Sequence, residues 1–295
     1  MKALRSLLFV PGNRQDMLQK AQALRPDALI PDMEDSVTAA EKNKARETVA
    51  FMLAPLNQAG HTLIPRINSL GTGLLEKDLE AVIGPNIYGV SVGKFDSARD
   101  AQQVISIVEV LERKAGLESG RIKLIPWIET AKAIVNAYEI CSASPRIIGV
   151  AFGAEDFTAD MEIPRSEESA EIVYPRSVIG TAAKAADVMA LDTPYPNFRD
   201  AEGLKRDSFV ARQYGFKGRF AIHPTQIETI NSIFSPAPQE VEYAKRVVQA
   251  FEEAEALGRG ATSLDGKLID VPIVKRAQKL LALAESIDQR KATWS

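Results

Sequence analysis

Acidic side chains follow two neighbouring apolar runs near the middle of the chain. The run Ile122–Ile128 ends at Glu129, and the run Ile147–Phe152 is followed by Glu155 and Asp156. Apolar residues at helical spacing lie between the two runs, as in a strand–helix–strand unit. Because parallel strands joined by a helix place their carboxyl ends side by side, we expect Glu129 and Asp156 to lie close together. Mg²⁺ takes one or two such carboxylates, with water and substrate completing its shell, so the spacing predicts a magnesium site.

Short apolar runs alternate with amphipathic stretches along most of the chain, a pattern typical of repeated βα units. The predicted strands are Ser6–Val10, Ala28–Pro31, Thr62–Ile67, Tyr88–Val92, Ile122–Ile128, Ile147–Phe152, Met189–Thr193 and Arg219–Ile222. The predicted helices are Gln15–Leu24, Glu41–Ala54, Leu74–Ile83, Ala98–Lys114, Ala131–Cys141, Val178–Ala186, Ala201–Tyr214 and Gln226–Phe234. Eight such units in roughly 230 residues predict an α/β fold of the (β/α)₈ TIM-barrel type. A doubly wound sheet is the alternative, but the residues after the first run, Val10–Arg14, are not its Gly-rich fingerprint.

Polar groups follow these predicted strands one after another. They include Arg14, Asp32, Glu34, Asp35, Arg66, Asn68, Lys94, Glu129, Glu155, Asp156, Tyr195 and His223. In a barrel the carboxyl ends of the strands form one rim, so these groups would converge there. A simpler interpretation is that Glu129 caps a helix and Asp156 is a solvated loop residue. Scattered surface charges would not fall so regularly at strand ends, and the regularity favours a functional site.

Composition narrows the class of protein. The chain has 295 residues, enough for one large barrel or two ordinary domains. A net charge of −3 excludes a broadly basic surface for nucleic acid. The single cysteine, Cys141, excludes a disulfide framework and fits a reducing compartment. The first apolar run, Leu7–Val10, is too short for a signal peptide, and no later run is long enough for a membrane span, so we expect a cytoplasmic enzyme.

Beyond the predicted barrel the alternation of apolar runs and amphipathic stretches ends. A Ser-Pro-Ala-Pro stretch at residues 235–238 precedes a charged helix over Gln239–Leu257, a Gly-rich loop over Gly258–Gly266 and a last helix over Val271–Ser286. We predict a catalytic barrel over residues 1–235 and a helical extension over 236–295, with the loop as a lid. The alternative is that the last helix only packs on the barrel or on a neighbouring subunit.

Taken together, these motifs resemble the family of citrate lyase β-subunits, malyl-CoA lyases and citramalyl-CoA lyases, within the HpcH/HpaI aldolase superfamily. The resemblance covers nearly the whole chain and rests on RSLLFVPGNR, DMEDSV, RIN, IET, GAEDFTAD, TPYPNFRDAEGL, GFKGRFAIHPTQI and GKLIDVPIV. It implies a (β/α)₈ barrel, in agreement with the count of strands. It also implies Mg²⁺-dependent aldol cleavage or condensation of 3-hydroxyacyl thioesters, with coenzyme A as part of the substrate.

The resemblance assigns roles to individual residues. Glu129 and Asp156 match the two Mg²⁺ ligands of the family. Arg66 matches an arginine that contacts the substrate and stabilises developing negative charge. Asp270 matches an aspartate that a neighbouring subunit inserts as an acid/base. Glu34 and Asp35 match acids that lie beside the metal site or bind its waters. Arg14 and the turn of His223 match regions that line the CoA side.

Several of these residues also have a structural interpretation. Arg66 would alternatively form an internal ion pair with Glu34 or Asp35, although the substrate role is favoured. Asp270 precedes Val271-Pro272 and would cap the last helix. Lys94 would form a Schiff base with a carbonyl substrate, although a contact with carboxylates or phosphate is favoured beside the acidic pair. His223 is expected to bind or support rather than catalyse.

The expected function is a Mg²⁺-dependent lyase that converts malyl-CoA or citramalyl-CoA to acetyl-CoA and a 2-oxo acid, or catalyses the reverse condensation. The alternatives are the β subunit of citrate lyase acting on an acyl-carrier-protein thioester, a malyl-CoA thioesterase, and a metal-free structural or regulatory barrel. A lid acting in trans implies a homo-oligomer, a trimer or a hexamer. The expected partners are therefore the CoA thioester, the 2-oxo acid and further copies of the chain, with neither nucleic acid nor membrane.

Overall fold

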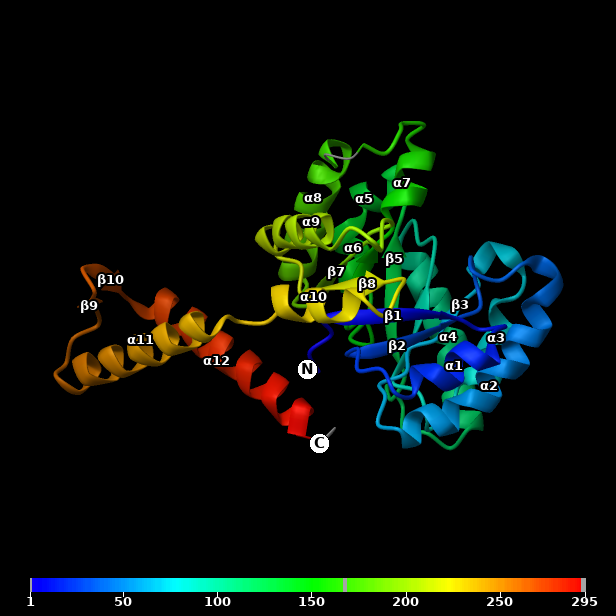
Figure 1. Cartoon of the computed structure of the whole chain (residues 1–295), viewed down its shortest axis with the longest axis horizontal. Coiled ribbons are helices and arrows are strands. Elements are labelled where there is room, and N and C mark those ends of the chain that lie inside the picture. The colour runs from blue at the N-terminus through cyan, green and yellow to red at the C-terminus, as the bar shows by residue number, and fades with distance from the viewer. Residues whose placement is uncertain (1, 167–168, 293–295) are drawn as a thin grey trace. The chain divides into compact units, whose positions relative to one another are not determined.

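The computed structural model describes residues 2–166 and 169–292, which divide into two compact units. The larger unit, Leu4–Asn231, contains a closed barrel of eight parallel strands in chain order from β1 to β8. Helices surround the strands (Figure 1). The smaller unit contains the C-terminal helices, from Ser232 onward. The predicted (β/α)₈ TIM barrel is confirmed.

The strands begin and end close to their predicted limits. They are β1 (Ser6–Pro11), β2 (Ala28–Asp32), β3 (Arg66–Ile67), β4 (Gly89–Val92), β5 (Lys123–Ile128), β6 (Gly149–Phe152), β7 (Met189–Asp192) and β8 (Gly218–Ala221). Only the third differs by more than two residues. Pro65 has no N–H to donate, so the regular ladder of β3 begins after it, while Leu63 still pairs with Leu29 as an isolated bridge.

The helices of the barrel unit follow the strands in alternation. They are α1 (Gln15–Ala21), α2 (Lys42–Gln58), α3 (Leu75–Val82), α4 (Ala98–Lys114), α5 (Ala131–Val135), α6 (Ala137–Ser142), α7 (Ala154–Asp160), α8 (Val173–Ala185), α9 (Ala201–Gln213) and α10 (Gln226–Ile233), with short 3₁₀ turns at Ala39–Glu41, Leu70–Thr72 and Ala170–Ile172. Among the described residues, no helix has the length and hydropathy needed to cross a bilayer.

Helix α8 begins five residues before its predicted start at Val178, and α2 ends four residues after its predicted end at Ala54. Two further differences are larger. The single helix expected over residues 131–141 is divided at Asn136, which leaves helical geometry with φ −95° and ψ 13° and donates its side-chain amide to Asp96 O at 2.8 Å. The short helix α7 was not predicted. It begins directly after Gly153, at the end of β6, and places Asp156 in its first turn.

Apolar side chains fill the inside of the barrel. Trp127 and Phe220 lie with ring centroids 4.4 Å apart, and Phe9 stacks on Phe220 at 5.2 Å. Leu7 and Ile30 continue the same buried cluster. Burying apolar surface stabilises a fold by roughly 25 cal/mol per Å², so this packed interior is a main source of the barrel's stability. The polar groups of the rim lie at one end of this packed interior.

The smaller unit pairs two long helices, α11 (Pro238–Ala256) and α12 (Val271–Ala292), around buried side chains such as Phe251 and Ile269. The prediction of an irregular Gly-rich loop before α12 is wrong in part. Antiparallel strands β9 (Thr262–Leu264) and β10 (Lys267–Ile269) form a hairpin there. Its two turn residues, Asp265 and Gly266, have φ values of 51° and 74°, as a two-residue Asp-Gly turn requires.

Candidate active site

Arg66 lies at the carboxyl end of β3 and is surrounded by acids. Its Nε and Nη2 atoms donate to the two carboxylate oxygens of Asp32, each at 2.7 Å. Its Nη1 atom lies 2.8 Å from Asp35 and 3.4 Å from Glu34. Burial opposes the charge, but these carboxylates outweigh it and hold the pKa of Arg66 above its ordinary value. The guanidinium is therefore always charged at this rim. The predicted ion pair with Glu34 or Asp35 is present, but the main partner is Asp32, which was not predicted.

Glu129 follows β5 and is buried, with 3% of its surface exposed. The backbone N–H of Lys94 donates to its Oε2 at 2.9 Å. The alternative in which Glu129 caps a helix is wrong, because the next residue, Thr130, accepts the capping bond from Ala133 N at 3.0 Å. The carboxylate of Glu129 is thus directed into the site rather than used for secondary structure.

Two glycines leave room beside this carboxylate. A Cβ atom built on Gly153 would lie 2.6 Å from both Cγ and Oε1 of Glu129. A Cβ atom on Gly93 would lie 3.0 Å from Glu34 Oε1 and 3.3 Å from Glu129 Oε2. Glu34 and Glu129 therefore face the same small space from either side of Gly93. The Oε1 atom of Glu34 is buried and has no hydrogen-bond partner in the described structure.

The carboxylates of this space repel one another. Burial raises the pKa of Glu129 to about 8, with further contributions from Asp156 and Glu34. Burial also raises the pKa of Glu34 to about 7, helped by Asp35 and Asp32 and opposed by Arg66. Asp156 has its pKa raised by burial as well, although Lys94 opposes the shift. The predicted proximity of Glu129 and Asp156 is consistent with this mutual influence, and the cluster contains more negative charge than its cations balance.

The donor set fits a hard divalent cation. All of the candidate ligands are carboxylate oxygens, those of Asp156 and Glu34 raise the pKa of Glu129, and one buried oxygen of Glu34 lacks a partner in the described structure. Among the described residues no three His, Cys, Asp or Glu side chains form a complete metal cage. Two protein carboxylates with the other positions left to water and substrate is the arrangement that Mg²⁺ favours. Glu129 and Asp156 are the residues that would hold it.

Lys94 lies on the loop after β4 in a left-handed conformation, with φ 60°, which is uncommon for a residue other than glycine. Burial lowers the pKa of its ammonium, but Asp156 and Glu34 oppose this effect and leave the pKa above its ordinary value. A protonated amine cannot attack a carbonyl carbon. The arrangement therefore disfavours the Schiff-base alternative and supports a role for Lys94 as a cation facing the carboxylates.

Comparison with known proteins identifies the family. Residues 5–224 match the model of the HpcH/HpaI aldolase/citrate lyase family. The chain belongs to this family. It is 38% identical to citrate lyase subunit beta of Haemophilus influenzae, with 97% of this chain and 98% of the relative covered. It is 34% identical to mitochondrial citramalyl-CoA lyase of Homo sapiens, with 97% and 87% covered.

Solved structures agree with this membership in the citrate lyase family. The CitE protein of Mycobacterium tuberculosis, in complex with magnesium, acetoacetate and coenzyme A, aligns with a TM-score of 0.77 at 31% identity, covering 96% of this chain and 98% of that one. A (3S)-malyl-CoA thioesterase of Cereibacter sphaeroides is 33% identical, with 98% and 97% covered. These findings confirm the predicted family, barrel and enzyme class, a lyase. Their names do not agree on one substrate.

Two other residues predicted for the site, Arg14 and His223, have local contacts. Arg14 is half-exposed on the loop after β1, and its Nε and Nη2 atoms pair with Asp16 at 3.0 Å. His223 follows β8, stacks on Phe198 with centroids 4.7 Å apart, and shares a hydrogen bond with Thr225. Both residues belong to loops at the carboxyl ends of strands, as predicted.

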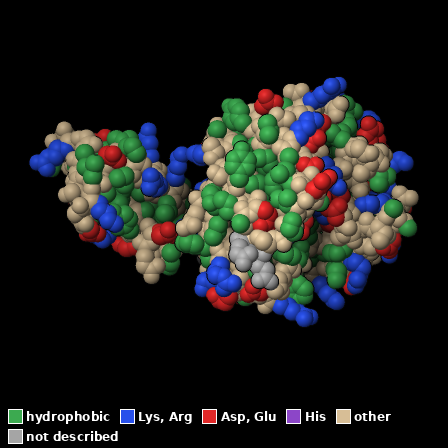
Figure 2. Space-filling model, turned by 90° about the horizontal axis from the view of Figure 1, so that it is seen from above, with side chains coloured by type: hydrophobic (Ala, Val, Ile, Leu, Met, Phe, Trp, Pro, Cys, Tyr) green, Lys and Arg blue, Asp and Glu red, His purple; other side chains and the backbone are tan. Residues whose placement is uncertain are grey.

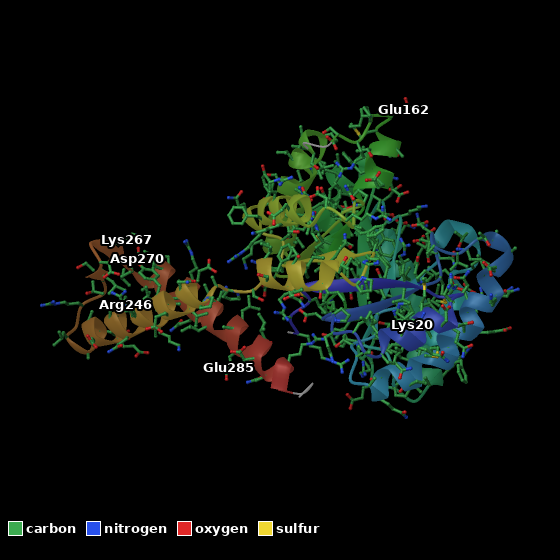
Figure 3. The ribbon with its side chains drawn as sticks, in the orientation of Figure 1. Lys20, Glu162, Arg246, Lys267, Asp270 and Glu285 are labelled. Atoms are coloured by element: carbon green, nitrogen blue, oxygen red, sulfur yellow. The ribbon has the colours of Figure 1, made fainter. Side chains whose placement is uncertain are left out.

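Asp270 belongs to the smaller unit, where it stands at the start of α12 (Figure 3). Its Oδ1 atom accepts a hydrogen bond from Ile273 N at 3.3 Å, and its carbonyl oxygen accepts one from Val274 N at 3.0 Å. The helix cap that the sequence suggested is therefore present. The predicted acid/base role of Asp270 stays a prediction.

The sequence did not single out the groups that support Arg66. Asp32 was recognised only as one of several strand-end acids, and Phe9 was assigned to a strand without a further role. The guanidinium carbon lies 4.5 Å from the centre of the Phe9 ring and 5.8 Å from that of Trp127. The available signal was the cluster of three acids after β2, because three acids at one strand end require a cation beside them.

Proposed function

We propose that the chain is a Mg²⁺-dependent carbon–carbon lyase acting on a 3-hydroxyacyl-CoA such as malyl-CoA or citramalyl-CoA, with acetyl-CoA and a 2-oxo acid as products. The observation that carries the proposal is the convergence of Arg66 with the buried carboxylates of Glu129 and Glu34 and the half-buried carboxylate of Asp156 at one rim of the barrel. A relative of this architecture contains magnesium, acetoacetate and coenzyme A together. The human relative at 34% identity is named a citramalyl-CoA lyase.

The proposed reaction removes a proton from the substrate's hydroxyl group, and the carboxylate of Asp270 from a neighbouring subunit would accept it and later return it to the enolate carbon. The bond between the hydroxyl-bearing carbon and the carbon next to the thioester then breaks, and its electron pair becomes the enolate of acetyl-CoA. When bound at Glu129 and Asp156, Mg²⁺ would polarise the substrate's hydroxyl and carboxylate oxygens as a Lewis acid. Arg66 would donate hydrogen bonds to the oxygen on which negative charge develops. One preorganised donor of this kind lowers a barrier by about 3–4 kcal/mol.

The enolate carbon must finally receive a proton. We assign this step to Asp270 of a neighbouring subunit, which would contribute roughly 10²–10⁴-fold as a general acid/base. Arg14, Lys94 and the turn at His223 would line the CoA side of the pocket. Glu34 and Asp35 would accept hydrogen bonds from water in the metal's shell.

We further propose a homo-oligomer in which residues 1–235 form the catalytic barrel and residues 236–295 extend toward a neighbour, in a cytoplasmic trimer or hexamer. Hydrophobic side chains stand among the charged ones on the molecule's surface (Figure 2). On α5 and α6, Val135 is 84% exposed and Tyr138 is 55% exposed. They line a groove of about 410 Å³ against α8. Exposed apolar surface of this kind is typical of contacts between proteins and supports association.

A second candidate is the lyase subunit of a citrate lyase complex, which would act on a carrier-protein thioester. The 38% identity to citrate lyase subunit beta over nearly the full length of both chains favours it. A thioesterase is the third, since a relative at 33% identity is named a (3S)-malyl-CoA thioesterase. A metal-free structural barrel is not supported, because Arg66 and the buried carboxylates are all present.

The test is to measure the products formed from malyl-CoA and citramalyl-CoA, with Mg²⁺ and with EDTA. We expect Mg²⁺-dependent acetyl-CoA with an equal amount of 2-oxo acid, lost in Glu129→Gln but kept in Glu155→Gln, an exposed acid nearby. Asp270→Asn keeps a side chain that can cap α12 and is expected to lose turnover. Free CoA with intact malate would identify a thioesterase instead. Turnover of a carrier-protein thioester alone would identify the citrate lyase subunit.

A further inference from the structure

Asp32 is the last residue of β2 and is almost completely buried, with 1% of its surface exposed. It accepts four hydrogen bonds. Two come from the Arg66 guanidinium, at 2.7 Å each. The other two come from the backbone N–H groups of Glu34 at 2.9 Å and Ser36 at 3.1 Å. A carboxylate offers about four acceptor sites, so this one is fully used and cannot turn.

These bonds fix the plane of the Arg66 guanidinium. Nε and Nη2 meet the two oxygens of Asp32 in a parallel fork, which sets the direction of the group as well as its position. The Phe9 ring lies 4.5 Å from the guanidinium carbon and supports it from one face. The remaining edge, at Nη1, is directed toward Asp35 and Glu34. That edge is the one that faces the carboxylate cluster.

The same carboxylate also shapes the loop that follows it. By holding the N–H groups of Glu34 and Ser36, Asp32 sets the course of the chain through the acidic segment. Lys42 supports this segment from α2, where its Nζ atom donates to Met33 O at 2.8 Å and Glu34 O at 2.7 Å. Arg66 and the acidic segment are therefore positioned by one shared group.

We propose that Asp32 is a positioning residue of the lyase. It makes no contact with substrate and acts through Arg66, whose Nη1 edge it holds toward the point where charge develops on the enolate oxygen. This inference rests on the proposed function.

The same strand offers a matched control at its other end. Asp27, directly before β2, is equally buried and binds the guanidinium of Arg5, with Nε at 2.8 Å and Nη2 at 2.9 Å. This pair lies at the amino end of the barrel, away from the rim that holds the site. Asp27→Asn and Asp32→Asn therefore remove the same charge from similar pairs, one far from the chemistry and one beside it.

The experiment compares these two variants in the full chain, measuring kcat, KM, Mg²⁺ affinity by calorimetry and thermal stability. Asp32→Asn is expected to lower kcat by about 10²-fold, with Mg²⁺ affinity and KM changed by less than about threefold. Asp27→Asn is expected to lose stability but to keep kcat within about twofold. In an Arg66→Lys background, Asp32→Asn should cause almost no further loss, because two residues acting as one unit are not additive.

Additive losses with Arg66→Lys, or equal losses of kcat in the two asparagine variants, would overturn the proposal. If Asp32→Asn does not fold, Asp32→Glu keeps the buried charge and displaces the guanidinium by one methylene group. Wild-type kcat in Asp32→Glu would also overturn it. If the wild-type protein cleaves no thioester, the proposed function fails, and the N–H resonance of Arg66 Nε in NMR tests the positioning separately. That signal should be protected from exchange and should lose protection in Asp32→Asn, and unchanged protection would contradict the inference.

Discussion

The backbone N–H of Lys94 donates to Glu129 Oε2 at 2.9 Å, so the loop after β4 holds the carboxylate that follows β5. Lys94 makes this contact in a left-handed conformation, with φ 60°. The position therefore has two separable functions. Its backbone orients the proposed metal ligand Glu129, and its ammonium faces the carboxylates.

Substitution separates these two functions of Lys94. Both Lys94→Gly and Lys94→Ala remove the ammonium and keep the N–H. Alanine is strained at a positive φ and glycine is not, so Lys94→Ala should be less stable than Lys94→Gly by about 1 kcal/mol. Denaturant unfolding measures this difference. Equal stability of the two variants would show that the loop does not keep its left-handed turn in solution.

Alanine substitutions at Gly153 and Gly93 are expected to weaken Mg²⁺ binding to different extents. A Cβ atom at Gly153 would lie 2.6 Å from Glu129 Cγ and Oε1, so Gly153→Ala must displace the proposed Mg²⁺ ligand. A Cβ atom at Gly93 meets only the ends of carboxylates, at 3.0 Å or more. We expect Gly153→Ala to weaken Mg²⁺ binding by at least about tenfold and Gly93→Ala by only a few-fold. Calorimetric titration with Mg²⁺ provides the comparison, and a reversed order would argue against Glu129 as a ligand.

The sequence predicted the barrel and the positions of its rim residues well, for a physical reason. Strand ends and their polar residues are local features, and the topology of parallel βα units brings them together. Glu129 and Arg66 could therefore be placed at one rim before any coordinates. The main ion-pair partner of Arg66 could not be identified from the sequence. Asp32 lies 34 residues away from Arg66, and Glu34 and Asp35 beside it were equally possible partners.

Other features were missed because their local signals were weak or were not used. The helix α7 has only seven residues, too few for a hydrophobic period to stand out. The hairpin β9–β10 was interpreted as a loop, although Asp265-Gly266 is a two-residue turn signal flanked by Leu264 and Lys267. Its strands are three residues each, and the glycines around them suggested flexibility instead.

Helix α8 contains one buried and one exposed cation, which allows a matched test of stability. Arg176 is 1% exposed and binds Asp192 at 2.9 Å and Asp207 at 2.8 Å, and Arg219 also contacts both acids. Removing Arg176 leaves buried carboxylates short of positive charge, so Arg176→Met should destabilise the protein by about 3–5 kcal/mol. Lys184, 3.4 Å from Asp187 on the surface, should tolerate alanine within about 0.5 kcal/mol. Urea unfolding of both variants measures these losses. A loss for Arg176→Met as small as that for Lys184→Ala would show that the buried ion pairs of Arg176 contribute little to stability.

Cys141 provides a prediction about pH, because its thiol is buried on α6 and burial raises its pKa to about 12. In the unfolded chain a cysteine loses its proton near pH 8.5. Between these values the folded protein retains a proton that the unfolded chain has lost, so stability should fall as pH rises from about 8.5 toward 12. At pH 10 the loss attributable to this thiol is about 2 kcal/mol. Comparing the unfolding free energy at pH 8 and pH 10 with that of Cys141→Ala isolates this contribution, which the variant should lack. A thiol reagent should likewise modify Cys141 only after unfolding, and rapid labelling of the native protein at pH 8 would contradict its burial.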